Sequence, residues 1–183
     1  MSTYHVGEKK IIKKDILHCE DEKYRDFDYE SANQSMEFLG KHLYEFICED
    51  DDVIPQVFTL LFNYFDENPD YFKLEGIFRK PGNKSLEEEM AKELEDGNYE
   101  FLQTVEDPYT VATFIKKVLR QMGEPLCTYS RYEEFKSMGD DLNEDRCIEN
   151  VKKTLSKLPY RNRETFYALL NFLGHVLIFE EDN

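Results

Sequence analysis

The sequence predicts an all-α protein, a compact array of helices. Each segment with a clear apolar pattern repeats that pattern at intervals of three and four residues, the period of an amphipathic helix. No segment alternates apolar and polar residues over the length of a strand. Prolines and glycines divide the pattern into about seven or eight helices, and no internal repeat is visible. Such a pattern is typical of a multi-helix domain with one core.

Length and composition are those of one acidic globular domain. The 183 residues include 23 Lys and Arg against 39 Asp and Glu, a formal net charge of −16, and 40% of the residues are apolar. That charge argues against nucleic acid as the main partner, because phosphate binding needs a broad cationic surface. No apolar run reaches the ~18–20 residues that cross a bilayer, and the charged start lacks the apolar stretch of a signal peptide. We expect a soluble cytoplasmic protein, for which any recruitment to a membrane is indirect.

No metal site or catalytic pair of its own is predicted. The four cysteines and four histidines are scattered, with no C-x-x-C pair, so the cysteines are expected to be free, mostly packed thiols. The acidic stretch 140–149 suggests a calcium loop but fails on spacing. Counting twelve residues from Asp141 puts Arg146 where the loop glycine belongs and Lys152 where the bidentate glutamate belongs.

The chain divides into a polar arm, residues 1–34, and a domain, residues 35–183. Within the domain, residues 36–48 have the period of a first helix. Pro55 suits the first turn of the next helix, which is apolar over much of its circumference and therefore central. Asn68-Pro69 ends that helix.

The next segments are bounded by glycine, proline and capping residues. Residues 76–82 form a loop with a glycine at each end, and residues 85–88 have the pattern of a capping box that opens a helix ending at Asp96-Gly97. Asp107 is predicted to cap a helix that begins at Pro108 and stops before Gly123. Further helices are expected from Ser130 to Met138, from Asn143 to Leu158 and from Arg163 to Phe179.

A small cationic group stands out in this acidic chain. Lys116 and Arg120 lie four residues apart on one helix face, where the two positive charges repel each other unless a nearby anion neutralises them. Glu124 is placed to be that anion, and spacing alone does not decide between such a pairing and a functional role. The loop 76–82 and its flank add Arg79, Lys80 and Lys84. An arginine on a stiff turn suits the neutralisation of charge on a transferring phosphate, although most surface arginines have no such role.

Two motifs in order narrow these possibilities. The string Glu75-Gly-Ile-Phe-Arg-Lys-Pro-Gly82 resembles the arginine-finger loop of Rho GTPase-activating (RhoGAP) domains. The segment 111–126, Val-Ala-Thr-Phe-Ile-Lys-Lys-Val-Leu-Arg-Gln-Met-Gly-Glu-Pro-Leu, resembles the helix V-A-x-x-L-K-x-x-L-R-x-L-P-x-P-L of the same family. The resemblance covers about residues 38–183 and implies a helical RhoGAP-like fold.

The resemblance also implies roles for individual residues. Arg79 would be the finger that enters the nucleotide pocket of a GTPase. Lys116 would contact the GTPase and the finger loop, and Arg120 would brace that loop, whereas Lys117 is expected to be a solvated surface lysine. The remaining residues expected at the partner-binding surface are Gly76, Gly82, Lys84 and Asn183.

The function implied is the stimulation of GTP hydrolysis by a GTP-bound Rho-family GTPase. GTP and Mg²⁺ would belong to that partner, since the chain has no G-x-x-x-x-G-K-[ST] loop, no substrate pocket of its own is expected, and no cofactor is predicted. Gly123 stands where the family has proline, which is expected to loosen that turn. Asn183 matches only the first Asn of the family's N-K-M…N-L-A segment, so the domain is expected to be shortened at its C-terminus. The last helix is then expected to expose apolar surface, and a non-catalytic GAP-like binding module is the alternative.

Overall fold

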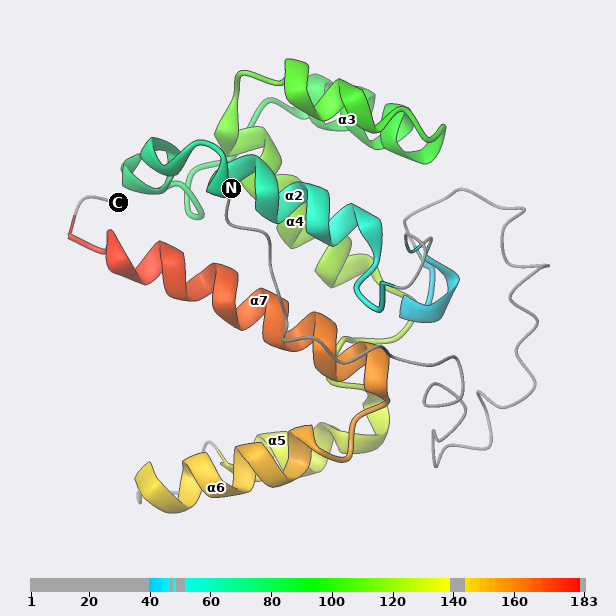
Figure 1. Cartoon of the computed structure of the whole chain (residues 1–183), viewed down its shortest axis with the longest axis vertical. Helices are drawn as coiled ribbons and strands as arrows, with labels where there is room; N and C mark the ends of the chain where they lie inside the picture. Colours follow the sequence, from blue (N-terminus) through cyan, green and yellow to red (C-terminus); the bar gives the residue numbers. More distant parts are fainter. Residues whose placement is uncertain (1–39, 47, 49–51, 139–143, 182–183) are drawn as a thin grey trace.

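The computed structural model describes residues 40–46, 48, 52–138 and 144–181, and they form the array of helices in Figure 1. The α-helices are α2 (Gln56–Asp66), α3 (Lys84–Glu95), α4 (Pro108–Gln121), α5 (Tyr132–Met138), α6 (Glu144–Leu155) and α7 (Tyr160–Ile178). Short 3-10 helices are η2 (Leu43–Glu45), η3 (Pro69–Lys73), η4 (Tyr99–Thr104) and η5 (Tyr129–Arg131). These residues contain no strand, which confirms the all-α prediction.

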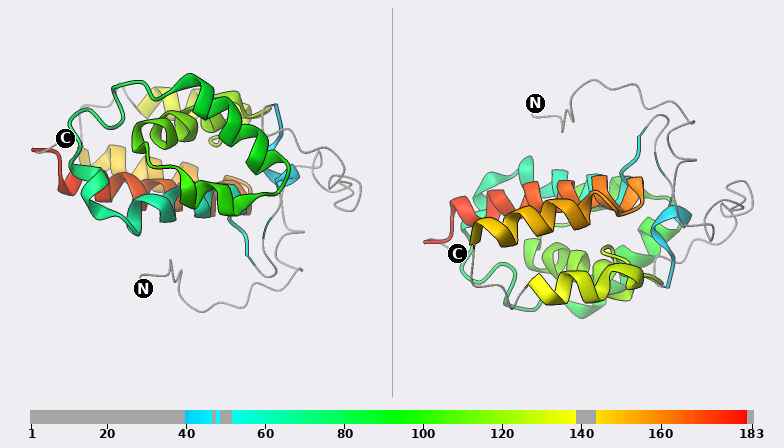
Figure 2. Two further views of the ribbon diagram at one scale, coloured as in Figure 1. Left: turned by 90° about the horizontal axis from the view of Figure 1, so that it is seen from above. Right: turned by 90° about the horizontal axis from the view of Figure 1, so that it is seen from below.

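The helices are stacked around α2 and α4. Figure 1 shows α3 on one side of this pair, α7 on the other, and the α5–α6 hairpin diverging from α7. In Figure 2, α3 lies nearest the viewer from above, and α5 and α6 from below. α2 is the central helix expected from its apolar circumference, with these residues buried: Val57, Phe58, Leu61, Phe62, Tyr64 and Phe65.

Stacked aromatic rings join α7 to the core. Phe172 is fully buried, and its ring lies 4.6 Å from that of Phe62 on α2. The same ring meets Phe65 at 5.6 Å, and Phe72 and Phe78 each at 5.8 Å. Aromatic pairs at such distances are worth about 0.5–1.5 kcal/mol beyond their burial. Phe78 belongs to the loop after η3, so α7 supports that loop from inside the molecule.

The prediction of a first helix over residues 36–48 is wrong for the part of that segment that the structure describes. In residues 40–46 only the 3-10 turn η2 forms. The Gly40 N–H donates to the carbonyl of Gln121 at 2.7 Å, and the Gly123 N–H donates to the carbonyl of Lys41 at 2.8 Å. These two bonds hold residues 40–41 against the end of α4. Backbone groups of this segment are thus hydrogen-bonded although the segment forms no α-helix.

The same contact explains the glycine at position 123. A Cβ atom there would lie 2.3 Å from the carbonyl oxygen of Gly40, and a proline would lack the N–H that bonds Lys41. Gly123 therefore fastens the turn to the segment before η2, and the expectation that it loosens the turn is wrong.

Two helix starts also differ from the prediction. α3 is capped by Asn83, whose side chain accepts bonds from the Ser85 and Leu86 N–H groups, so Ser85 is not the cap. α7 begins at Tyr160, directly after Pro159, and not at Arg163. Asp107 does cap α4, accepting from the Tyr109 N–H, with Pro108 in the first turn as predicted.

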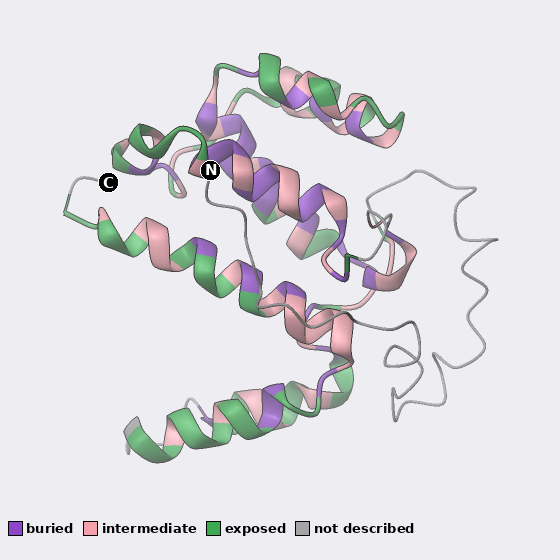
Figure 3. Cartoon of the chain, in the orientation of Figure 1, coloured by how far each residue is buried: buried purple, intermediate pink, exposed green. Residues whose placement is uncertain are grey.

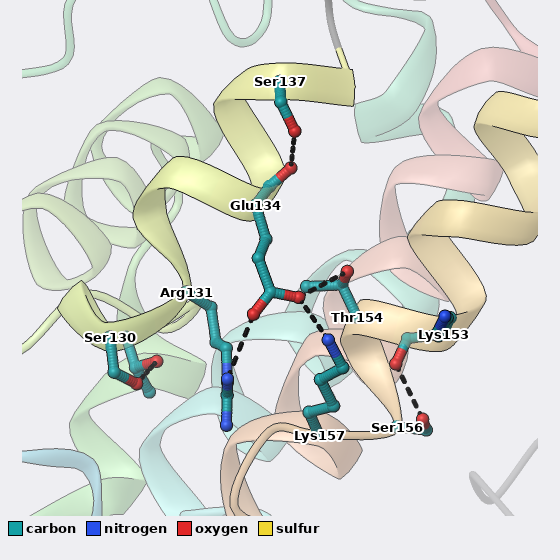
Figure 4. A network of polar contacts seen from close by, with 9 residues as sticks. Ser130, Arg131, Glu134, Ser137, Lys153, Thr154, Ser156 and Lys157 are labelled. Carbon is teal, nitrogen blue, oxygen red and sulfur yellow. Dashed lines mark hydrogen bonds and ion pairs between the residues drawn. The ribbon is translucent and has the colours of Figure 1, made fainter.

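Glu134 joins the two helices of the α5–α6 hairpin (Figure 4). Its carboxylate accepts from Lys157 at 2.6 Å, from Arg131 at 3.0 Å and from the Thr154 hydroxyl at 3.3 Å. The hydrogen bond from Lys157, aided by Arg131, lowers the pKa of the Glu134 carboxyl. The hairpin is therefore tied by a carboxylate that is charged at neutral pH.

Protonation of Glu134 is expected to loosen this hairpin in acid. A carboxyl whose folded pKa is lowered adds stability above its unfolded pKa, and this stability is lost as pH falls through the folded pKa. The thermal midpoint, followed by circular dichroism at about pH 6 and about pH 3, should therefore fall less in Glu134→Gln than in the parent chain. Glu149→Gln, at an exposed position of α6, is the control. An equal fall in Glu134→Gln and the parent would contradict this assignment.

Cysteine, metal and membrane features are few in the described residues. Cys48, Cys127 and Cys147 are free thiols, and burial raises the pKa of the first two. No described group of His, Cys, Asp and Glu is arranged to hold a metal ion. None of the described helices has the length and apolar character needed to cross a membrane.

Candidate functional site

The loop between η3 and α3 carries Arg79 at a tight turn. Gly76 has φ +69°, a region that glycine enters without steric cost. Its carbonyl accepts the N–H groups of both Arg79 and Lys80 at 2.8 Å. These two hydrogen bonds close a tight turn between Gly76 and Lys80. The turn fixes the backbone of Arg79 and therefore the point at which the Arg79 side chain leaves the loop.

The residues before Arg79 anchor the loop in the core. Ile77 is 1% exposed, and the Phe78 ring packs 5.8 Å from the ring of Phe65 and 5.8 Å from that of Phe172. Two inward-facing apolar side chains therefore precede an outward-facing arginine. The loop tip is rigid because its neighbours are buried, not because Arg79 is itself packed.

The Arg79 guanidinium is exposed and weakly held. Its side chain is 73% exposed, and its Nη2 lies 3.5 Å from Oε1 of Glu75. Lys80 reaches the same oxygen at 3.3 Å. Exposed pairs of this kind contribute about 0–1 kcal/mol, so an incoming anion can replace Glu75 at little cost. The arrangement offers a planar, permanently charged group to a phosphate-like oxygen cluster.

Side chains of α4 hold the front of the loop. The Tyr109 hydroxyl donates to the Glu75 carbonyl at 3.2 Å. Lys116 donates from Nζ to the Phe78 carbonyl at 2.8 Å, directly before Arg79. The predicted contact between Lys116 and the finger loop is therefore present, and the ammonium group is exposed beside Arg79.

Two threonines of α4 hold the rear of the loop. The Gly82 N–H donates to the Thr113 hydroxyl at 3.1 Å, and the Asn83 N–H donates to the Thr110 hydroxyl at 2.8 Å. The Thr110 hydroxyl donates in turn to Asp107 at 2.6 Å, and Thr110 is fully buried. The cap of α4 and the end of the loop therefore share one hydrogen-bonded chain.

Gly82 is required by this packing. A Cβ atom at position 82 would lie 2.3 Å from the Cα of Thr110. Only glycine lets the loop backbone approach α4 closely enough for the two threonine bonds. This gives Gly82 a structural role beside the partner-binding one predicted for it. Lys84, also predicted at the binding surface, is exposed in the first turn of α3, 3.8 Å from Glu88.

Lys117 corrects one expectation. Its ammonium lies 2.7 Å from Glu87 on α3, and the two side chains are only 19% and 15% exposed. It is therefore a largely buried ion pair between α3 and α4 and not a solvated lysine. Because α3 follows the loop directly, the Lys117–Glu87 pair holds the start of α3, and with it the end of the loop, against α4.

Arg120 lies one turn beyond Lys116 on α4 and is exposed. Among the described residues, no hydrogen bond or ion pair joins Arg120 to the finger loop or to Glu124. The pairing of Arg120 with Glu124 is therefore not formed. Glu124 lies instead 3.9 Å from the ring nitrogen of His42. The bracing role of Arg120 stays a prediction, and Asn183 lies outside the described residues.

Sequence reasoning missed the hydroxyl residues of α4. Tyr109, Thr113 and Lys116 follow one another at intervals of four and three, and Thr110 is adjacent. That spacing places polar groups along one side of the helix, next to the apolar stripe. This periodicity was the available signal, since hydroxyls beside a glycine-bounded loop are suited to bind its backbone.

Comparison with known proteins identifies the family. A family profile described as RhoGAP domain matches residues 55–183, more than half of the chain. The chain is 32% identical over 124 residues to Rho GTPase-activating protein gacN of Dictyostelium discoideum, covering 67% of this chain and 20% of that protein. It is 31% identical over 111 residues to Rho GTPase-activating protein 22 of Mus musculus, covering 60% and 16%. The chain thus corresponds to a fifth or less of the length of these relatives.

The fold agrees with this assignment. The crystal structure of human Rho GTPase activating protein 15 superposes with a TM-score of 0.68 at 22% identity, covering 84% of this chain and 73% of that one. The described finger loop and the helix that holds it lie within the matched residues 55–183. The chain therefore belongs to the RhoGAP family.

Proposed function

We propose that this chain activates GTP hydrolysis by a Rho-family small GTPase, which it binds in the GTP-bound state. The observation that carries the proposal is the exposed Arg79, on a loop whose two ends and tip carbonyl are bonded to α4. The GTPase supplies GTP, Mg²⁺ and the attacking water. This chain supplies a cation in trans.

Arg79 acts on charge at the transferring phosphate. As the bond to the γ-phosphate breaks, negative charge develops on oxygens that a guanidinium can contact through two N–H groups. Because the loop is already ordered by Gly76 and the α4 contacts, little reorganisation accompanies the approach of Arg79. Glu75 neutralises Arg79 in the free protein and yields to the phosphate on docking.

Lys116 has two tasks in this arrangement. One N–H of its ammonium is used by the Phe78 carbonyl, which fixes the backbone before Arg79. The ammonium carries two further N–H groups, and the side chain is exposed beside the finger, where the GTPase surface would lie. Arg120, one turn on, extends the same cationic strip on a chain of net charge −16.

The alternative is a GAP-like module that binds a small GTPase without accelerating hydrolysis. Single-turnover hydrolysis by GTP-loaded members of the Rho, Rac and related groups, with and without the chain, separates the two. Acceleration with at least one GTPase supports the activator. Binding to a GTPase loaded with a non-hydrolysable GTP analogue, without acceleration by the chain, supports the module.

Thr110 tests the support of the loop. Thr110→Val keeps the shape but removes the acceptor of the Asn83 N–H and the donor to Asp107. Because small displacements of a reacting group are costly, we expect the maximal rate of activated hydrolysis to fall about tenfold or more, with little change in the concentration for half-maximal activation. Thr110→Ser should restore the rate. Thr104→Val is the matched control, because within the described residues the Thr104 hydroxyl bonds the Phe101 carbonyl and not the loop. An unchanged rate in Thr110→Val would contradict the role.

A further inference from the structure

Lys116 and Arg120 are two cations of α4 that no described carboxylate neutralises. Among the other cations near the finger, Arg79 and Lys80 lie 3.5 and 3.3 Å from an oxygen of Glu75. Lys116 and Arg120 are both exposed, and Lys116 bonds a carbonyl oxygen, which carries no full charge. Two cations four residues apart on a helix repel each other, so this pair favours an anion from outside the described residues.

An acidic segment of the same chain is tethered beside this pair. The Gly40 N–H donates to the carbonyl of Gln121 at 2.7 Å, so the chain before Gly40 starts next to Arg120. Residues 26–30, Asp-Phe-Asp-Tyr-Glu, carry three carboxylates and no cation, and nine residues separate them from Gly40. Nine residues span up to about 30 Å, whereas residues 116 and 121 of α4 are about 7–8 Å apart along the helix axis. The segment can therefore reach both cations.

We propose that residues 26–30 of this chain bind Lys116 and Arg120 in the free protein and compete there with the GTPase. The inference rests on the proposed function, since both cations belong to the surface that is expected to bind the GTPase. A GTPase must displace the acidic segment before it contacts α4. The contact is therefore autoinhibitory, and it acts on binding of the GTPase and not on the finger itself.

The spacing of the carboxylates suits the spacing of the cations. Asp26, Asp28 and Glu30 are two residues apart in the sequence. In an extended stretch such positions lie on one side, at intervals of about 6.6 Å. Residues four apart on a helix are separated by about 6 Å along its axis. An extended stretch that lies along α4 can therefore place two successive carboxylates on Lys116 and Arg120 at once.

The tether sets the strength that is expected. Each exposed ion pair is weak by itself, but a short tether holds the segment at an effective concentration on the order of mM. We therefore expect partial cover, which salt weakens because the Debye length falls from about 10 Å at 0.1 M to about 3 Å at 1 M. If the segment covers the cations for about two thirds of the time, the concentration of chain that gives half-maximal activation rises about threefold.

Carbodiimide cross-linking of the full chain tests the contact without a GTPase, because it joins a carboxylate to a lysine only where the two touch. Mass spectrometry should find residues 26–30 joined to Lys116, and less of this product at about 1 M salt. Lys92 on α3 and Lys153 on α6, both exposed, are the reference lysines.

A mixture of isotope-labelled and unlabelled chain separates links within one chain from links between copies. The proposal is overturned if residues 26–30 do not join Lys116, if they join the reference lysines equally, or if the links form mainly between copies. A link of Lys116 to the other acidic run, residues 49–52, in place of 26–30 also overturns it.

Neutralising the segment measures the effect on activation. The variant replaces its three carboxylates by amides: Asp26→Asn, Asp28→Asn and Glu30→Gln. The concentration of chain for half-maximal activation should fall about threefold at low salt, with the maximal rate unchanged. The control variant removes the same number of charges from exposed positions of the α5–α6 hairpin (Figure 3): Glu133→Gln, Asp145→Asn and Glu149→Gln.

The control variant should match the parent. An unchanged half-maximal concentration in the variant of residues 26–30 would overturn the proposal, and so would an equal fall in the control, which would indicate an effect of net charge alone. If neither the parent nor the variant accelerates hydrolysis, the proposed function fails, and the cross-link to Lys116 alone decides whether the segment covers α4.

Discussion

Arg79→Ala is expected to remove most of the acceleration of GTP hydrolysis while leaving GTPase binding largely intact. In the related Ras system an arginine supplied in trans is worth ~10³–10⁵ in rate, and we expect a loss on that scale. The side chain is 73% exposed, and among the described residues its guanidinium pairs with Glu75 and lies over Gly76, so its removal is expected to leave the core unchanged. The effect therefore falls on the transition state and not on the fold.

The measurement is single-turnover hydrolysis at saturating activator, paired with binding to the GTPase loaded with a non-hydrolysable GTP analogue. Lys80→Ala is the matched control, because Lys80 is a cation on the same loop that contacts the same Glu75 oxygen. Arg79→Lys keeps the charge but loses the two-pronged contact, and should recover only a small part of the rate. A full rate in Arg79→Ala would remove Arg79 from the mechanism.

Local signals predicted most of the helices. Asp107-Pro108 predicted the start of α4, because an aspartate cap and a proline in the first turn each act within a few residues. The apolar circumference of α2 likewise predicted a central helix. The failures have tertiary causes: the segment after Gly40 has a helical period, but its backbone bonds the end of α4, about eighty residues away in sequence.

The motifs predicted Arg79 and Lys116 as site residues, but the hydrogen bonds that hold the loop were not predicted. Arg79 and Lys116 were nominated through motifs in which residue type and spacing repeat across a family, and the role of Arg79 as the finger stays a prediction. Thr110, Thr113 and Tyr109 bind backbone atoms of the loop, and their spacing in the sequence does not show which backbone N–H or carbonyl each one binds. Lys117 looked solvated because its partner Glu87 lies thirty residues earlier, within a run of three glutamates.

Phe172→Ala is expected to be the most destabilising substitution of those considered for the fold. The ring is fully buried, stacks on Phe62 and touches three further phenylalanines. Removing a buried phenylalanine ring costs about 3–5 kcal/mol, from lost transfer energy and from the cavity that remains. A typical domain has about 5–15 kcal/mol in total, so the variant should be close to unfolding at physiological temperature.

Urea unfolding followed by circular dichroism measures this loss, with Asn171→Ala, at an exposed neighbouring position of α7, as the control expected to lie within about 0.5 kcal/mol of the parent. Phe172→Leu separates support of the loop from global stability. It keeps most of the volume, but it removes the edge-on contact with Phe78, the residue before Arg79. If the core positions the finger, Phe172→Leu should lower activated hydrolysis at temperatures where it is fully folded. If its rate equals that of the parent, the α4 bonds alone hold Arg79 in place.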